Sequence, residues 1–347
     1  MEPLRPLRER PPEEGARLLA LHHLDQAADA FPRLQDPADT EALHDFRVAL
    51  RRLRSCLRSY GPWLDKSLPR KLRRRLKKLA AATGPGRDTE VQIEWLRGRS
   101  RHLGSHHRAG LAWLLARLEE RMREANEDMA DHIPDEFPRL EEALRKRLST
   151  YTTEVHLDAA SRPTLAEAAA AILRDQASEL RSNLSHVEDP ADEEQAHEAR
   201  ISAKRLRYLL EPFAEELPEA ASVVKHMKGL QETLGELHDA HVLEHELAGS
   251  LDVAAVERAR RLLEINLSGV PDDALLRAER RRVRESGVLA LAKLNRVRRD
   301  RLFDDLETDW LDGQGEAFFE EVEALASRLE GSLSPGIGDG ERGDGIN

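Results

Sequence analysis

The sequence predicts an all-α protein built from two antiparallel helical bundles, and three observations support that prediction. The chain of 347 residues is 40% hydrophobic and 34% charged but only 4% aromatic, whereas β-sheets favour aromatic and β-branched residues. Apolar residues recur every three or four positions along most of the chain, which is the period of an amphipathic helix. Two motifs also occur twice in the same order, which predicts an internal repeat with pseudo-twofold symmetry.

Helices are expected wherever this period is bounded by Pro or Gly. In the first half the expected helices are 15–30, 39–60, 65–82, 88–101, 105–130 and 136–150. In the second half they are 164–185, 191–217, 219–234, 238–249, 253–267, 271–285 and 288–307. The domain division that follows is a first bundle at 10–155, a second at 160–310, a C-terminal helix at 311–330 and a disordered, Gly-rich tail at 331–347.

Overall charge and cysteine count narrow the class of protein. The net charge of −11 excludes a uniformly basic coat for nucleic acid. A single cysteine, Cys56, excludes an intrachain disulfide and suits a reducing compartment. The N-terminus lacks the apolar core of a signal peptide, and no apolar run approaches the roughly 18 residues of a membrane span. We therefore expect a cytoplasmic protein without a membrane partner.

The charges are strongly segregated along the chain. Residues 44–78 hold thirteen Lys or Arg against two acids, and residues 277–301 hold ten bases against three acids. Residues 119–142 are the reverse, with ten acids and three bases. Because like charges packed this densely repel one another, an anion bound among the bases would relieve the repulsion.

The first repeated motif contains most of the basic residues. His44-x-x-Arg47-x-x-x-Arg51 aligns with His197-x-x-Arg200-x-x-x-Lys204 at an offset of 153 residues. The second motif, Gly84-x-x-Arg-Asp, aligns with Gly235-x-x-His-Asp at an offset of 151. Two motifs that repeat in order at nearly the same offset predict two related bundles.

On a helix of about 100° per residue, the cations of the first motif form one stripe beside a core face that contains Phe46 and Leu50. This stripe consists of His44, Arg47, Arg51, Arg54 and Arg58. The second copy repeats it with His197, Arg200, Lys204 and Arg207, and has Glu211 at the position of Arg58. Arg52 and Arg205 fall on the far flank. The helix after each stripe adds Arg74, Lys77 and Lys78 in the first half, and Lys225 and Lys228 in the second.

A basic stripe beside a core face is expected to line a central basic groove or pore between helices. Arg guanidinium groups form bidentate hydrogen bonds to phosphate oxygens, and Lys adds a point charge. A His one turn earlier donates a hydrogen bond to the same anion. The predicted ligand is therefore an extended polyanion with phosphates along its length. In the competing interpretation, the bases pair with the protein's own acids, such as Glu198, Glu211 and the segment 119–142.

At this point the sequence resembles the CHAD family, the "conserved histidine α-helical domain". The resemblance rests on both copies of both motifs and covers about residues 10–310. It implies two bundles around a basic groove or pore that binds inorganic polyphosphate, and association with polyphosphate granules. By matching position it implies ligand contacts from the His, Arg and Lys residues of both stripes, supported by the basic residues of the following helices. His238, in place of a second Arg before Asp239, departs from the symmetry, as does Glu211.

Many relatives carry a CYTH triphosphatase domain with a Glu-x-Glu-x-Lys signature, and this sequence contains no such signature. The resemblance therefore implies a binding module that stands alone and does not catalyse turnover, with no cofactor and no metal. Its oligomeric state stays open.

Other interpretations remain open beside this one. His238, His241 and His245 share one helical face, as in a metal-dependent phosphohydrolase, although no second cluster completes a coordination sphere. A nucleic-acid binder would use the same phosphate contacts, but the stripes contain almost no aromatic residue for base stacking except Tyr208.

Three smaller expectations concern single residues. Gly84 and Gly235 are each expected to precede a helix, where free backbone N–H groups could bind phosphate, although such glycines more often only close a turn. Asp88 and Asp239 are expected to cap or orient a neighbouring Arg and not to be catalytic. Cys56 lies off the basic stripe and is expected to be a small packing residue.

Overall fold

The computed structural model describes residues 6–36, 38–39, 41–65, 67–150, 163–267, 276–277, 284–312 and 314–331. Within these ranges every regular element is a helix and there is no strand, which confirms the all-α prediction. The predicted boundary between 155 and 160, most of the predicted helix 271–285 and the predicted tail after Gly331 lie outside the described residues. None of the described helices is both long and apolar enough to cross a bilayer.

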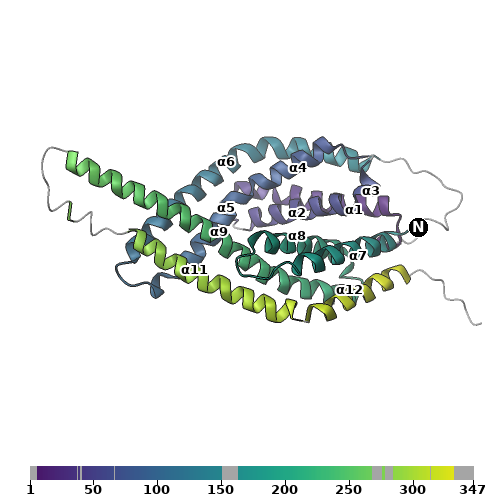
Figure 1. Cartoon of the computed structure of the whole chain (residues 1–347). Helices are drawn as coiled ribbons and strands as arrows, with labels where there is room; N and C mark the ends of the chain where they lie inside the picture. The colour runs from purple at the N-terminus through teal and green to yellow at the C-terminus, as the bar shows by residue number, and fades with distance from the viewer. Residues whose placement is uncertain are drawn as a thin grey trace, which may run out of the picture.

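The first half folds as six α-helices with short 3₁₀ turns between some of them. They are α1 (Pro12–Ala30), α2 (Ala42–Ser59), α3 (Gly61–Leu64), α4 (Arg70–Ala82), α5 (Gly84–Arg97) and α6 (Arg108–Ser149). The second half contributes α7 (Leu165–Leu184), α8 (Glu193–Leu210), α9 (Pro218–Leu267), α11 (Arg284–Leu306) and α12 (Gln314–Gly331). Figure 1 shows α2 and α8 near the middle of the molecule, with α4 and α6 on one side and α11 and α12 on the other, while the long α9 runs from beside α8 to the upper left.

Three predicted helix breaks were wrong, one in the first half of the chain and two in the second. The segments 105–130 and 136–150 are one helix, α6, which contains Pro134 and Pro138. The segments 219–234, 238–249 and 253–267 are also one helix, α9, which runs through Gly235 and Gly249. A glycine inside a helix costs only about 1 kcal/mol relative to Ala, and the buried apolar residues on either side offset that cost by packing.

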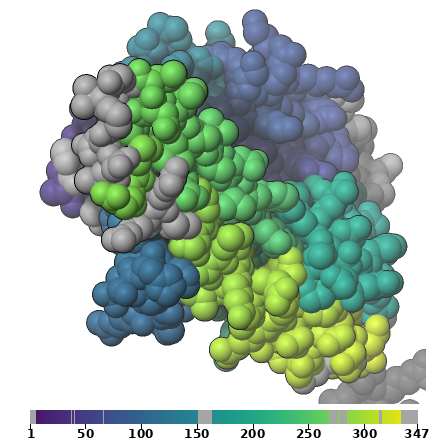
Figure 2. Space-filling view, turned by 60° about the vertical axis from the view of Figure 1, so that its left-hand side comes forward, coloured from purple at the N-terminus to yellow at the C-terminus, as the bar shows by residue number. Residues whose placement is uncertain are grey.

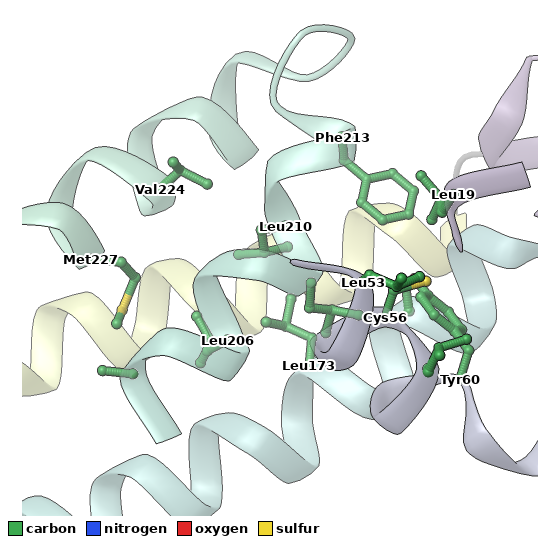
Figure 3. Close-up of a cluster of buried hydrophobic side chains, with 14 of the residues drawn as sticks. Leu19, Leu53, Cys56, Tyr60, Leu173, Leu206, Leu210, Phe213, Val224 and Met227 are labelled. Carbon is green, nitrogen blue, oxygen red and sulfur yellow. The ribbon is translucent and has the colours of Figure 1, made fainter. Parts of the chain in front are cut away.

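Buried side chains form two clusters, and each cluster contains residues from both halves of the chain. The larger includes Leu53 of α2, Leu206 of α8 and Met227 of α9, and Figure 3 shows part of it around Leu53, Cys56 and Phe213. The smaller is made by α5, α6, α9 and α11, with Leu96, Leu114 and Leu291 fully buried. The hydrophobic cores therefore join the two halves.

One helix crossing in the smaller cluster depends on glycine. Gly110 of α6 faces Gly287 of α11 so closely that a Cβ on Gly110 would lie 2.4 Å from the Arg284 carbonyl oxygen. A Cβ on Gly287 would lie 2.4 Å from the carbonyl oxygen of His107. Only residues without a side chain allow the two backbones to approach this closely.

Candidate functional site

A cleft of about 750 Å³ opens between α2, α4 and α8, and we call it the central cleft. Its lining is Arg51, Arg54, Ser55, Leu57, Arg58, Arg73, Leu76, Lys77, His197, Ile201, Lys204, Arg205 and Tyr208. Figure 2 shows a hollow between the violet-blue residues of the first half and the teal and green residues of the second. Seven of the lining side chains are Arg or Lys, and none is Asp or Glu.

The packing of α2 and α8 explains how these cations come together. On α2 the predicted core residues Phe46, Leu50 and Leu53 are fully buried, which directs the stripe that contains Arg51 and Arg54 to the edge of the core. On α8, Leu206 and Leu210 are also fully buried. The two helices contact each other, so the predicted core faces place cations of both stripes in one cleft.

Five cations of the cleft form no ion pair with an acid of the part of the chain that the structure describes. Arg73 pairs with Asp65, and the Nη1 atom of Arg205 lies 2.6 Å from Glu179. Among the residues that the structure describes, no carboxylate forms an ion pair with the other five. We call these five the unpaired set: Arg51, Arg54, Arg58, Lys77 and Lys204. Asp239 acts on Lys204 through space, and Glu179 and Glu198 act on Arg58, but burial and the neighbouring cations outweigh them and lower the pKa of both side chains.

The crowding of cations changes their protonation. Burial, with a further contribution from Arg200 and Arg51, lowers the pKa of Lys204 to about 7. Burial is also the largest cause of the lowered pKa values of Arg47 and Arg200, and Arg51 adds to it in both. Each positive charge raises the free energy needed to protonate its neighbours. An anion bound in the cleft would therefore interact favourably with all of these cations.

The structure places other predicted residues around the cleft rather than in its lining. Arg47 and Arg200 are half-buried, and each has a neighbouring carboxylate, Asp88 for Arg47 and Asp239 for Arg200, that raises its pKa. The Nε atom of Arg207 lies 3.6 Å from Glu211. Outside the lining, the exposed predicted residues are His44, Arg74, Lys78, Lys225 and Lys228.

The lining also contains residues that the sequence did not single out for it. Arg205 was placed on the far flank, which was wrong, since it lines the cleft and pairs with Glu179 of α7. Arg73 and Ser55 were not considered, although Arg73 lies one turn before Lys77 on α4. Tyr208, which had been noted as an aromatic exception, packs its ring under the Arg207 guanidinium at 4.8 Å.

The repeated aspartates lie together beside the cleft. Asp88 of α5 and Asp239 of α9 line one small pocket with His238 and Arg298. Burial raises the pKa of Asp239, and Asp88 adds to that effect. Burial and the nearby cations lower the pKa of His238 to about 4. The two copies of the second motif thus meet close to Arg200, which interacts with both carboxylates.

Two other sequence interpretations do not fit the geometry. Gly235 lies inside α9, so its N–H group is not at a helix start, whereas Gly84 is the first residue of α5. His241 bonds the Pro190 carbonyl oxygen at 2.8 Å, and His245 bonds Glu193 at 2.6 Å. No group of three His, Cys, Asp or Glu side chains is arranged to hold a metal within the described ranges.

Cys56 is the packing residue that the sequence predicted. It is 8% exposed, and its Sγ atom lies 3.6 Å from the carbonyl oxygen of Ala16. Burial raises the pKa of its thiol to about 12.

The family comparison decides the identity of this fold. The sequence model of the CHAD domain matches residues 18–248, about two thirds of the chain, including both copies of both motifs. The chain belongs to the CHAD domain family. The crystal structure of the CHAD domain from the plant Ricinus communis is similar to this CHAD protein with a TM-score of 0.58 and 20% identity, over 88% of this chain and 93% of that one.

A second solved structure is similar over most of the chain. PptA from Streptomyces chartreusis matches with a TM-score of 0.49 and 16% identity, over 85% of this chain and 99% of that one. No curated protein matches. Helices α11 and α12 follow the part of this CHAD protein that the family model matches.

Proposed function

We propose that this CHAD protein binds inorganic polyphosphate in the central cleft and holds it without turning it over. The observation that supports the proposal most is the unpaired set, five cations from three helices that face one cleft and form no ion pair with a carboxylate of the described residues. A linear chain of phosphates supplies one negative charge per link, which matches a row of cations at short intervals. Guanidinium and ammonium groups bind such oxygens directly.

The distribution of acids supports ligand binding over internal pairing. Of the fourteen residues predicted to contact the ligand, Arg207 alone forms an ion pair with an acid among the described residues. Glu211 accepts its closest hydrogen bond from Arg52, at 2.8 Å, on the flank away from the stripe. Within the described residues, the acids of segment 119–142 pair with other arginines and not with the unpaired set; these partners are Arg75, Arg97, Arg123 and Arg145. The protein's own acids therefore leave the cleft cationic.

The character of the lining supports polyphosphate over a nucleic acid as the ligand. Single-stranded nucleic acids are bound by aromatic platforms as well as by cations. Among the lining residues that the structure describes, Tyr208 is the one aromatic side chain, and Arg207 packs against its ring. We infer a ligand recognised through phosphate charge alone, and a location in the cytoplasm at polyphosphate granules, which imaging of a fluorescent fusion would test.

Calorimetric titration tests the ligand and the site together. Pyrophosphate, a long-chain polyphosphate and a charge-matched oligonucleotide are titrated into the full chain at one ionic strength. We expect the long polyphosphate to bind most tightly and the double variant Arg51→Gln/Lys204→Gln to lose about a hundredfold in affinity, on the order of one tenfold loss per charged contact. The matched control is Lys293→Gln/Arg296→Gln, which removes two exposed cations of α11. Equal affinity for the oligonucleotide would overturn the ligand, and equal losses in both variants would overturn the site.

A further inference from the structure

The C-terminal part of α9 carries apolar side chains on two opposite faces. One face packs into the molecule, where Ala254 and Ile265 are buried and α11 lies against α9. At about 100° per residue, Val256, Leu263 and Leu267 point about 180° away from that face. These three residues are 58%, 58% and 74% exposed. A helix that is apolar on both faces is normally buried on both, so one face of this end of α9 lacks cover within the part of the chain that the structure describes.

The exposed apolar residues belong to one row along the helix. Single apolar side chains are common on protein surfaces, whereas a group of them marks an interaction site. Three of the six large exposed apolar residues in the described ranges lie in this row, and Figure 1 shows this end of α9 reaching beyond the first turn of α11. We call the row the α9 stripe: Gly249, Asp252, Val256, Arg260, Leu263 and Leu267.

The two charged residues of the α9 stripe are opposite in sign and equally far from Val256. Asp252 stands four residues before Val256, and Arg260 stands four residues after it. Both are exposed, and neither forms an ion pair with a described residue. The neighbouring Arg258 does pair, with Glu285 at 3.3 Å. The opposite charges of the stripe are therefore available to a partner.

A second copy of the same stripe supplies the matching charges. If two copies lie antiparallel about a twofold axis at Val256, Asp252 of each copy comes opposite Arg260 of the other. Such a symmetric interface requires a surface that is complementary to itself. In the same register Leu263 of each copy comes opposite Gly249 of the other, where a Cβ would meet nothing within 4 Å. One register therefore pairs the charges, places a large side chain over a small one and covers Val256.

We infer that the α9 stripe is a self-association surface, on which two copies of this chain pair in antiparallel orientation. The surface is separate from the central cleft, which is lined from α2, α4 and α8, so the inference does not depend on polyphosphate binding. The charge pattern favours a second copy over a lipid surface, because an anionic bilayer would repel Asp252 and leave it without a partner. The stripe spans about 27 Å of helix, and a small interface of this kind predicts a reversible dimer with a dissociation constant on the order of micromolar.

Sedimentation equilibrium of the full chain, from about 1 μM to about 100 μM, tests the surface. We expect the wild type to dimerise as its concentration rises. The substitution Val256→Asp places two carboxylates opposite each other on the twofold axis, so we expect it to raise the dissociation constant at least about tenfold. The matched control is Val297→Asp, at a valine of α11 that is also 58% exposed, and it should dimerise like the wild type. Circular dichroism checks that each variant is folded.

Charge reversal tests the antiparallel register. Asp252→Arg and Arg260→Asp each place like charges opposite one another and should weaken the dimer. The double variant Asp252→Arg/Arg260→Asp restores opposite charges in reversed order, and we expect it to dimerise like the wild type. A wild type that stays monomeric up to about 100 μM overturns the inference. Unchanged dimerisation of Val256→Asp, an equal loss in Val297→Asp, or a double variant no better than the single ones overturns it as well.

Discussion

We predict that Lys204 links polyphosphate binding to pH, because burial and the neighbouring arginines lower its pKa in the free protein to about 7. At pH 7 about half of these side chains are charged, and at pH 8 about a tenth. A phosphate chain beside Lys204 favours the charged form and restores the pKa towards its ordinary value near 10.4. Binding therefore takes up about 0.5 proton at pH 7 and about 0.9 at pH 8 at this residue, and the affinity falls by up to about tenfold per pH unit above 7.

The substitution Lys204→Arg isolates this contribution. An Arg side chain keeps the charge in the cleft and does not deprotonate in this range. Calorimetry at pH 8 in two buffers of different ionisation enthalpy measures the protons taken up on binding. We expect the wild type to take up about 0.9 proton more than Lys204→Arg, and the contribution of the ligand's own phosphates cancels in the difference. Equal proton uptake by the two proteins would refute the reasoning, as would a wild-type affinity with the same pH dependence as the variant.

The remaining predictions concern salt, electrostatics, packing and reactivity. If the five cations of the unpaired set contact phosphates, the logarithm of the affinity should fall against the logarithm of salt concentration with a slope of about −3.5, and a slope near zero in a salt titration contradicts that. Glu211→Gln removes the acidic partner of Arg52 and of Arg207. We therefore expect tighter polyphosphate binding and a loss of at most about 1 kcal/mol in stability, and weaker binding in calorimetry would contradict this. The substitution Gly287→Ala brings a Cβ to 2.4 Å from a backbone oxygen. We expect it to destabilise the protein by about 1–3 kcal/mol in chemical denaturation, although Ala has the better helix propensity. An unchanged denaturation midpoint would show that α6 and α11 separate easily. Cys56, with its pKa near 12, should resist alkylation at pH 8 in the folded protein and react in denaturant, and rapid labelling of the native protein would show that the core around it opens.

Local sequence patterns predicted the helical class and the directions of the basic stripes. The pattern of Leu50 and Leu53 beside Arg51 and Arg54 on α2 was sufficient to predict the direction of the basic stripe, because a helix with that pattern has one orientation that buries its leucines. The same reasoning placed Lys204 beside the core on α8. These are short-range consequences of the helical period, and they require no knowledge of the partner helix.

Features that depend on tertiary packing were harder to predict from the sequence. Gly235 resembles a helix stop in the sequence, yet neighbouring Leu234 and Leu237 are buried, and their packing keeps α9 continuous. Arg205 lies on the far flank of an isolated helix, but in the folded protein it lines the cleft and pairs with Glu179 of α7. The pairing of Gly110 with Gly287 joins residues far apart in the sequence, so no local pattern marks it.

The most direct test of the central claim is a crystal structure of this CHAD protein grown with a medium-length polyphosphate. We predict continuous density for linked phosphates in the central cleft, with oxygens within hydrogen-bond distance of Arg51 on α2 and Lys204 on α8 at once. An empty cleft, with phosphates bound only at exposed lysines elsewhere on the surface, would contradict the account.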